Sequence, residues 1–439
     1  MENWFNYALN GNTKGLIELL NEVDIDSRGD IDDKNKGWTA LMMASRYSNT
    51  TSSLDTVKLL LERGADVNLK SIDGGWTALM MAAKYSNSNS SLDNVKLLLE
   101  YNADIDLKSS NGWTALILAS RNSNILSSLD TVKLLLKYNA DINLKGNDDW
   151  TALMEASRHS NIESSLETVK LLLDRGADVN LHSISRQTAL MLATKYSNTG
   201  SSLDTIKILL EYKAAVNLKN NNGWTALMMA SRYSNTSSSL DTVKLLLKYN
   251  PDVNLFNNDG FSALMLAAIN SNTNSSLDTV KLLLEYGADP FDNIQCPTEE
   301  CKNIIDEARW KQLYQRDKET AKRYSKNSEY YLPKDVWEII LLEKRRQQLC
   351  QNLSSNKNKG ILKLFAIELG ISITENTTKA QLCGYISGQL VYGKEDKYKN
   401  VVRNKLDKNA KNFLKLAKDL GIDTDRPLSE IFSDLARMY

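Results

Sequence analysis

Proline and cysteine are both scarce in this chain. Its 439 residues include only five prolines and four cysteines. All four cysteines (Cys296, Cys301, Cys350 and Cys383) lie in the last third. So few cysteines exclude a disulfide-rich secreted scaffold, and no histidine follows His182 to complete a zinc site with them. We therefore expect unpaired thiols and an intracellular protein, cytoplasmic or nuclear, that is not secreted.

Catalytic and membrane signatures are also missing. The chain has two histidines, His159 and His182, and lacks a G-x-x-x-x-G-K-[ST] phosphate-binding loop. Two isolated histidines supply neither a metal site nor a base for a nucleophile. No stretch approaches the roughly 18 apolar residues of a membrane span, and residues 1–20 are too polar for a signal peptide. We predict a non-enzymatic protein with no catalytic residues, no metal, no cofactor and no membrane association.

The formal net charge is zero, but the charges are unevenly divided. Residues 1–290 carry 27 basic and 33 acidic side chains, whereas residues 291–439 carry 27 and 21. A basic C-terminal third can contact phosphates, as in nucleic-acid binding. Lysine-rich stretches also form ordinary solvated faces, so this bias leaves both interpretations open.

One phrase dominates the first two thirds of the chain. The segment GWTALMMASRYSNTTSSLDTVKLLLERGADVNLK begins at Gly37 and returns six more times with small changes. Its tryptophan position is occupied by Trp38, Trp76, Trp113, Trp150, Gln187, Trp224 and Phe261, at one step of 38 residues and five of 37. A fixed period of this size predicts a solenoid.

Each copy predicts two short helices and a turn. The apolar run TALMMAS starts with a threonine that can cap a helix. After a polar stretch, LDTVKLLLE places its apolar residues on one helical face, with Ser52 or Ser53 as the cap and Gly64 as the stop. The remaining ADVNLK leads into the turn before the next copy. One copy cannot bury its apolar face alone, whereas stacked copies can.

These copies resemble the ankyrin repeat. The family pattern G-x-T-P-L-H-x-A-A, followed by V-x-L-L-L-x-x-G-A-D-V-N, matches all seven almost throughout. Ala-Leu-Met replaces the usual Pro-Leu-His, and the loop between the helices is about four residues longer than in the usual repeat of about 33. Long loops and uniform copies are similar to ankyrin proteins of giant DNA viruses, such as those of mimivirus. The resemblance implies an all-α ankyrin-repeat solenoid with β-turn fingers, followed by a small helical C-terminal region.

We divide the chain accordingly. The predicted parts are an N-terminal capping repeat over residues 1–35, seven repeats over 36–291, capping helices over 292–328, a helix over 329–352, and two helix–loop–helix units over 355–392 and 405–439. The first of these units carries a capping box between Thr378 and Gln381.

The ankyrin resemblance also implies where a protein target binds. The tryptophan position lies at the base of the finger, and the ends of the first helices lie near the concave face. The predicted target-binding residues are Trp38, Trp76, Trp113, Trp150 and Trp224; the basic residues Arg46, Lys84, Arg121, Arg158, Lys195 and Arg232; then Tyr47, Tyr85 and His159, which follow them; and Arg186.

Together these residues predict an aromatic and basic groove that suits an acidic, extended partner. The alternative is that the rings stack on one another to stiffen the array and that each arginine pairs with a nearby aspartate. Departures from the phrase cluster in the fourth and fifth copies, at Glu155, His159 and the finger at residues 182–187. They are explained either by drift or by a specific contact patch.

The segment YYLPKDVWEIILLEKRRQQLC resembles the first part of an F-box. F-boxes bind the Skp-type adaptor of cullin ubiquitin ligases, and poxvirus proteins place a truncated one after ankyrin repeats. By this resemblance Leu332, Pro333, Val336, Ile339 and Ile340 contact the adaptor. The chain would then be a viral substrate adaptor in the host cytoplasm or nucleus. The sequence that follows does not match the rest of an F-box, so an ordinary packed helix is the alternative.

The last two helix–loop–helix units are similar to SAP-like modules, which often contact nucleic acid. A nucleic-acid-associated scaffold that uses its basic tail is therefore the alternative function. A plain protein-binding scaffold is a third possibility. In each case we expect a monomer.

Overall fold

The computed structural model describes residues 2–29, 37–290 and 294–309, and single positions beyond them (311, 312, 315, 350, 378, 379, 381, 382, 418, 421, 423 and 425). The chain divides into two compact units, Met1–Ala288 and Asp289–Tyr439. The first unit contains the repeats.

Each repeat contributes a first and a second helix. The first helices are α1 (Glu2–Leu9), α3 (Ala40–Tyr47), α5 (Ala78–Tyr85), α7 (Ala115–Asn122), α9 (Ala152–His159), α11 (Ala189–Lys195), α13 (Ala226–Arg232) and α15 (Ala263–Ile269). The second helices are α2 (Thr13–Leu19), α4 (Leu54–Glu62), α6 (Leu92–Glu100), α8 (Leu129–Lys137), α10 (Leu166–Asp174), α12 (Leu203–Glu211), α14 (Leu240–Leu247) and α16 (Leu277–Glu285).

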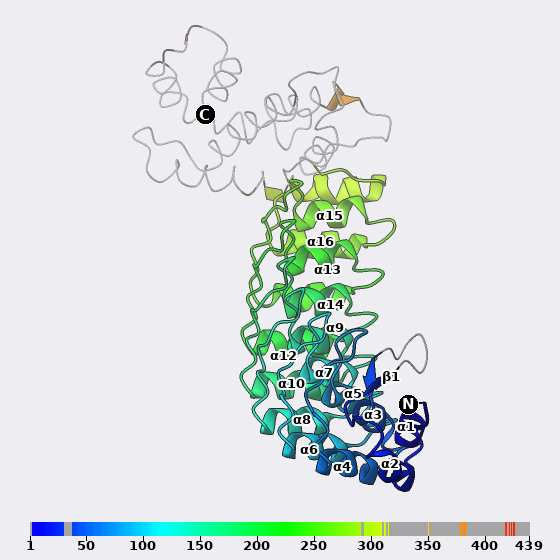
Figure 1. Ribbon diagram of the computed structural model, residues 1–439. Coiled ribbons are helices and arrows are strands. Elements are labelled where there is room, and N and C mark those ends of the chain that lie inside the picture. The colour runs from blue at the N-terminus through cyan, green and yellow to red at the C-terminus, as the bar shows by residue number, and fades with distance from the viewer. Residues whose placement is uncertain are drawn as a thin grey trace. The chain divides into compact units, whose positions relative to one another are not determined.

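The helices stack repeat upon repeat in two rows (Figure 1). Each first helix packs on the first helix of the next repeat, and each second helix does the same in its own row. The core consists of the apolar residues of TALMMAS and LDTVKLLLE, such as Leu153 and Leu172, which are buried in the fourth repeat. The predicted helical solenoid is confirmed. A short antiparallel pair, β1 (Arg28–Gly29) and β2 (Trp38–Thr39), joins the N-terminal repeat to the first full copy.

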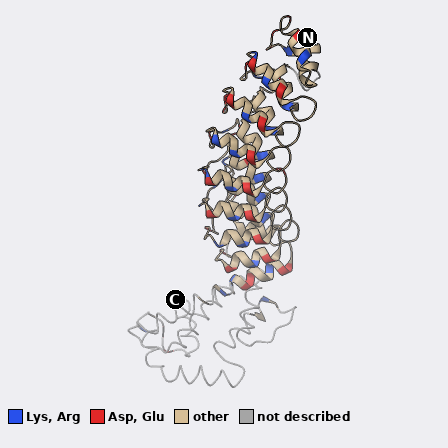
Figure 2. Ribbon diagram, turned by 90° about the horizontal axis from the view of Figure 1, so that it is seen from below, with Lys and Arg blue, Asp and Glu red and all other residues tan. Residues whose placement is uncertain are grey.

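The caps form where the sequence predicts them. Thr39 begins α3 by accepting a hydrogen bond from the backbone N–H of Met42 at 3.3 Å, and every later first helix has the same kind of cap. Ser53, not Ser52, caps α4, since the Ser52 hydroxyl donates instead to the Ala8 carbonyl at 2.7 Å. An acidic residue occupies the first turn of each second helix from α4 onward, where it meets the positive end of the helix dipole (Figure 2).

The long polar loop between the two helices joins neighbouring repeats. The Ser86 hydroxyl lies 2.6 Å from the Thr131 hydroxyl and 3.1 Å from that of Ser127, both in the next repeat. Equivalent serines at the later steps are Ser123, Ser160, Ser197 and Ser234, of which Ser197 is half-buried and the others are buried. Each hydroxyl is therefore satisfied across a repeat boundary, which removes the cost of burying it. The extra loop residues thus serve the stacking of the array.

The second unit is described only in part. Residues 299–309 are helical, with Cys301 and Ile305 buried. Thr378 and Gln381 exchange hydrogen bonds of 2.8 and 3.2 Å, which confirms the predicted capping box. A thiol–thiol hydrogen bond of 2.7 Å joins Cys301 to Cys296, whereas Cys350 is disulfide-bonded, so the prediction of unpaired thiols is wrong for Cys350.

Several predicted features lie outside the described residues. The F-box-like residues Leu332, Pro333, Val336, Ile339 and Ile340 are among them, as are most of the two helix–loop–helix units. Their predicted structures and roles, and the predicted capping of the solenoid by residues 292–328, stay predictions.

The fifth repeat has a lysine after its second helix, at a position whose positive φ favours glycine. Gly64, Gly176 and Gly287 have positive φ at this position, and Lys213 adopts the same conformation with φ of 65°. Because a side chain in this region is strained, Lys213→Gly should raise the free energy of unfolding by about 0.5–1 kcal/mol. Urea unfolding followed by circular dichroism measures the gain. Lys213→Ala, which removes the charge but keeps a Cβ, should give none; an equal gain from alanine would contradict the strain explanation.

Candidate functional site

The predicted basic residues lie on aromatic rings of their own repeat. They end the first helices and are called here the cationic row: Arg46, Lys84, Arg121, Arg158, Lys195 and Arg232. The distances from their charged groups to the tryptophan ring centroids are 5.7 Å for Arg46–Trp38, 5.2 Å for Lys84–Trp76, 5.5 Å for Arg121–Trp113, 5.4 Å for Arg158–Trp150 and 5.3 Å for Arg232–Trp224. Lys195, whose repeat has Gln187 instead, lies 5.2 Å from the Tyr196 ring.

The cationic row also links one repeat to the next. The Arg46 guanidinium lies 4.2 Å from the Tyr85 ring centroid and 5.2 Å from that of Tyr47, and Arg158 lies 5.0 Å from Tyr196. The structure therefore brings together the three sets of residues that the sequence indicated. Such cation–π contacts contribute about 0.5–1 kcal/mol each at partly exposed sites.

Some predicted residues are placed differently from the rest. Trp38 is only 4% exposed, which leaves little of its ring for a partner. Asn122, at the tyrosine position of the third repeat, is buried and donates to the Leu118 carbonyl. Arg186 is exposed in the fifth finger, with φ of 58° where most copies have glycine, next to the exposed Ile184.

The fourth repeat carries a charged cluster in place of the regular pattern. Glu155 lies where the other repeats have methionine or leucine, and it is 5% exposed. Its Oε2 is 3.6 Å from Arg121 Nη1 and 3.6 Å from His159 Nε2. Glu163 Oε2 accepts a hydrogen bond of 3.0 Å from Arg121 Nε and lies 3.6 Å from His159 Nδ1. Among the described residues, Arg121 is the one member of the cationic row with a carboxylate partner.

Burial is the largest cause of the pKa shifts of Glu155 and His159 in this cluster. It raises the pKa of Glu155, although the positive charges of Arg121 and Arg158 oppose the shift. Burial, with Arg121 and Arg158, lowers the pKa of His159 to about 4 against the opposing charge of Glu163. His159 is therefore neutral at pH 7, and its contacts with the two glutamates are not ion pairs there.

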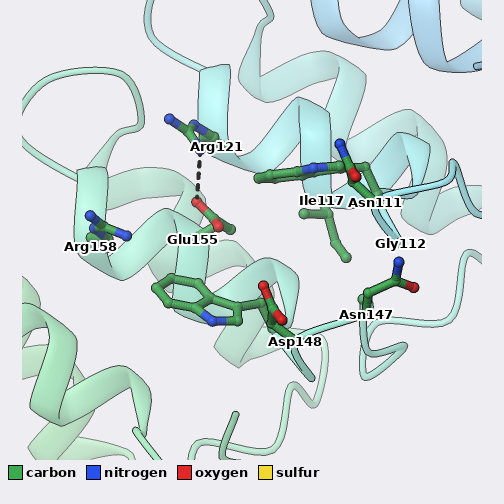
Figure 3. Close-up of a pocket in the computed structure, with 11 residues that line it drawn as sticks. Asn111, Gly112, Ile117, Arg121, Asn147, Asp148, Glu155 and Arg158 are labelled. Carbon is green, nitrogen blue, oxygen red and sulfur yellow. Dashed lines mark ion pairs between the residues drawn. The ribbon is translucent and has the colours of Figure 1, made fainter. Parts of the chain in front are cut away.

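A pocket of about 520 Å³ opens beside this cluster, between the third and fourth repeats. Trp113 and Trp150, from successive finger bases, line it together with Ile117, Glu155 and Arg158. Asp148 and Asn147 of the intervening finger complete another wall (Figure 3). The Glu155 carboxylate points toward Arg121 at the pocket's edge (Figure 3). The pocket thus combines aromatic walls with a buried acid.

Sequence reasoning found part of this site. Glu155 and His159 were recognisable as departures from the repeated phrase, whereas Glu163 was missed. The sequence did carry a signal for Glu163. The equivalent positions of the other repeats hold threonine, asparagine, leucine, glycine and serine, none of which is charged. The predicted alternative, in which each arginine pairs with an aspartate, is not observed for the cationic row: Arg121 pairs with glutamates and the others contact rings.

The repeats match the family model described as ankyrin repeats (3 copies). The matches cover residues 4–71, 53–146, 86–183, 126–219, 162–256 and 190–294, which together make up about two thirds of the chain. The chain therefore belongs to the ankyrin repeat family.

Its relatives include ankyrin repeat proteins of Acanthamoeba polyphaga mimivirus. The chain is 45% identical to protein L86 over 60 residues, which are 13% of this chain and 10% of L86. It is 63% identical to L289 over 35 residues (8% and 6%) and 37% identical to L91 over 68 residues (15% and 11%). The chain thus matches about a tenth or less of each relative's length, and the predicted similarity to giant-virus ankyrin proteins is confirmed for the repeats.

Within the part of the chain that the structure describes, no helix is both long and apolar enough to cross a bilayer.

Proposed function

We propose that the solenoid is a binding scaffold for a partner protein that presents an extended acidic segment to the cationic row. The observation that carries this proposal is the lack of neutralising charge. Within the described residues, Arg46, Lys84, Arg158, Lys195 and Arg232 have aromatic neighbours but no carboxylate within 4.0 Å.

The spacing of these charges favours an extended partner. Their first helices pack on one another from repeat to repeat, so the row advances by one cation per repeat. Each ring holds its cation in place, which reduces the side-chain entropy that binding would otherwise remove. An acidic chain laid across several repeats gains one charge contact at each step.

Binding of poly-L-glutamate to the full chain tests this proposal. Replacing Arg46, Arg158 and Arg232 together with glutamine should weaken binding at least tenfold at 50 mM salt, since three charge contacts contribute about 0.5–1 kcal/mol each. The matched control replaces Lys58, Lys133 and Lys244 of the second helices with glutamine and should change affinity less than threefold. Equal losses from both triple variants, measured by fluorescence anisotropy, would show diffuse charge attraction and contradict the proposal.

A finer proposal makes the chain a viral substrate adaptor, in which the repeats hold a target while Leu332–Ile340 recruits a Skp-type adaptor and cullin ligase. It is supported by the F-box resemblance of that segment and by the similarity of the repeats to mimivirus proteins. Capture of the adaptor from host lysate by the intact chain, and not by a Leu332→Ala/Pro333→Ala/Ile339→Ala variant, is the expected result. Capture by neither would remove this proposal.

Nucleic-acid binding by the basic C-terminal third is the rival function. It would appear as binding of a single-stranded oligonucleotide that weakens steeply with salt and is unchanged in the Arg46, Arg158 and Arg232 variant. The absence of catalysis, an intracellular location and a monomeric state remain predictions from the sequence.

A further inference from the structure

The pocket between Trp113 and Trp150 differs from every other repeat boundary in one residue that matters for recognition. Met43, Met81, Leu118, Leu192, Met229 and Leu266 fill the position that Glu155 holds in the fourth repeat, and all are buried. A carboxylate in an apolar position costs folding free energy. Here that carboxylate lines an open pocket instead of a closed core.

The Glu155 carboxylate is not fully satisfied within the chain. Its Oε2 is buried and has no hydrogen-bond donor, because the Arg121 and His159 nitrogens beside it are both 3.6 Å away. Arg121 directs its hydrogen bond to Glu163 instead, at 3.0 Å. His159 is neutral at pH 7 and adds no charge. A buried acceptor left in this way favours a ligand that brings a strong donor.

The charges around the pocket also favour a cation. Glu155 and Asp148 line the pocket together with Arg121 and Arg158, and Arg121 is already engaged by Glu163, so Arg158 alone balances the two lining acids. The two indoles add aromatic surface that attracts a cation and packs against an aliphatic stem. A compact ammonium needs only one strong acceptor, whereas a guanidinium is best matched by a carboxylate with both oxygens open to it.

We propose that this pocket receives the side chain of a single lysine from the partner, with its ammonium group against Glu155. This inference rests on the proposed function, since it places one lysine within the acidic segment bound along the cationic row. The lysine would fix the register of that segment at the third and fourth repeats. The rest of the partner's segment is acidic and lies along the cationic row. A basic residue at any other position of the segment would be repelled by the neighbouring arginines.

Two peptides that differ in one charge test the lysine pocket on the full chain. One is an acetylated, amidated peptide of four glutamates, a lysine and four glutamates; the other has Nε-acetyllysine at the centre. The cationic row alone predicts tighter binding of the acetyllysine peptide, because it is the more acidic. If the pocket binds lysine, the opposite is expected: the lysine peptide should bind at least tenfold more tightly. Calorimetry or fluorescence anisotropy measures the difference.

Variants at Glu155 complete the test. Glu155→Met, which installs the residue of three other repeats, should abolish the preference for lysine while retaining acetyllysine-peptide affinity within threefold. Glu155→Gln keeps the size of the side chain and should reduce the preference for lysine at least fivefold. It takes the place of Glu155→Met in this test if the methionine changes the fold. Binding of both peptides without a lysine preference overturns the pocket and leaves the scaffold proposal standing. Binding of neither peptide overturns both proposals.

Discussion

Glu155→Met is expected to raise the free energy of unfolding of the repeats by about 1–3 kcal/mol at pH 7, because it replaces a buried charge with a residue suited to its position. The position holds methionine in the first, second and sixth repeats, so the side chain fits the packing of the array. Arg121 keeps its hydrogen bond to Glu163 and is not left alone. The variant should therefore unfold at higher urea concentration than the natural chain.

The gain in unfolding free energy from Glu155→Met should increase as the pH rises. Burial raises the pKa of Glu155, so the folded chain binds this proton more tightly than the unfolded chain does. The penalty is therefore absent below the ordinary carboxyl range near 4.5 and grows as the pH rises through the raised pKa. The stabilisation by Glu155→Met should be larger at pH 7 than at pH 4.

Glu163→Ser is the matched control for this experiment. It removes the better partner of Arg121 at a position that is 36% exposed, and should lower the unfolding free energy by no more than about 1 kcal/mol. The two substitutions thus remove one negative charge each and are expected to act with opposite signs. A lower urea midpoint for Glu155→Met would mean that its contacts with Arg121 outweigh the desolvation of the carboxylate.

The repeats are also expected to lose about 2–3 kcal/mol of stability through His159 as the pH falls from 6.5 to about 4. The pKa of His159 is about 4 in the folded chain against an ordinary 6.5, so the unfolded chain takes up the proton first. The imidazole is only 15% exposed, and Arg121 and Arg158 oppose a third positive charge beside them. His159→Tyr, which installs the residue of four other repeats, should remove this loss.

Nuclear magnetic resonance can measure this pKa directly, because the chain has only two histidines. A His182→Asn variant assigns the remaining imidazole signal to His159, which should shift near pH 4. Glu155 and Glu163 each lie 3.6 Å from this ring, and their attraction acts in the other direction. A midpoint above 6.5 would show that the two carboxylates outweigh burial, and the acid-side loss would then disappear.

The stability expected of Glu155→Met is linked to the role proposed for Glu155 in binding lysine. If Glu155 destabilises the array and yet selects lysine, Glu155→Met will be both more stable and less selective. Polar residues in apolar positions commonly reflect such a compromise at binding sites. A variant that gains stability while keeping its lysine preference would separate the two properties and contradict the role given to Glu155.

Much of the repeat architecture could be predicted because it follows from local chemistry repeated many times. Thr39 and Ser53 are caps whose sequence signals lie within one turn of the helices that they begin. The Ser86–Thr131 contact could not be predicted in the same way, since it joins residues 45 positions apart through the geometry of stacking. The sequence showed the polar loop but not that its serines bridge repeats.

The candidate site was predictable in its composition and not in its pairing. Periodicity placed Arg121, Arg158 and the tryptophans on one face, and the structure keeps them there. What periodicity could not show is that rings, and not aspartates, accompany most of the row. Nor could it show that Glu163 engages Arg121 and leaves Glu155 beside an open pocket. Those details depend on side-chain distances across the boundary between the third and fourth repeats.

Amide hydrogen–deuterium exchange of the full chain, with and without poly-L-glutamate, tests the central claim most directly. If the cationic row holds an acidic partner, protection should increase at the ends of α7, α9, α11 and α13 and at the finger bases that carry Trp113 and Trp150. The second helices, including α8 and α10, should remain unchanged. Protection confined to the basic residues 291–439, with no change in the first helices, would contradict the account.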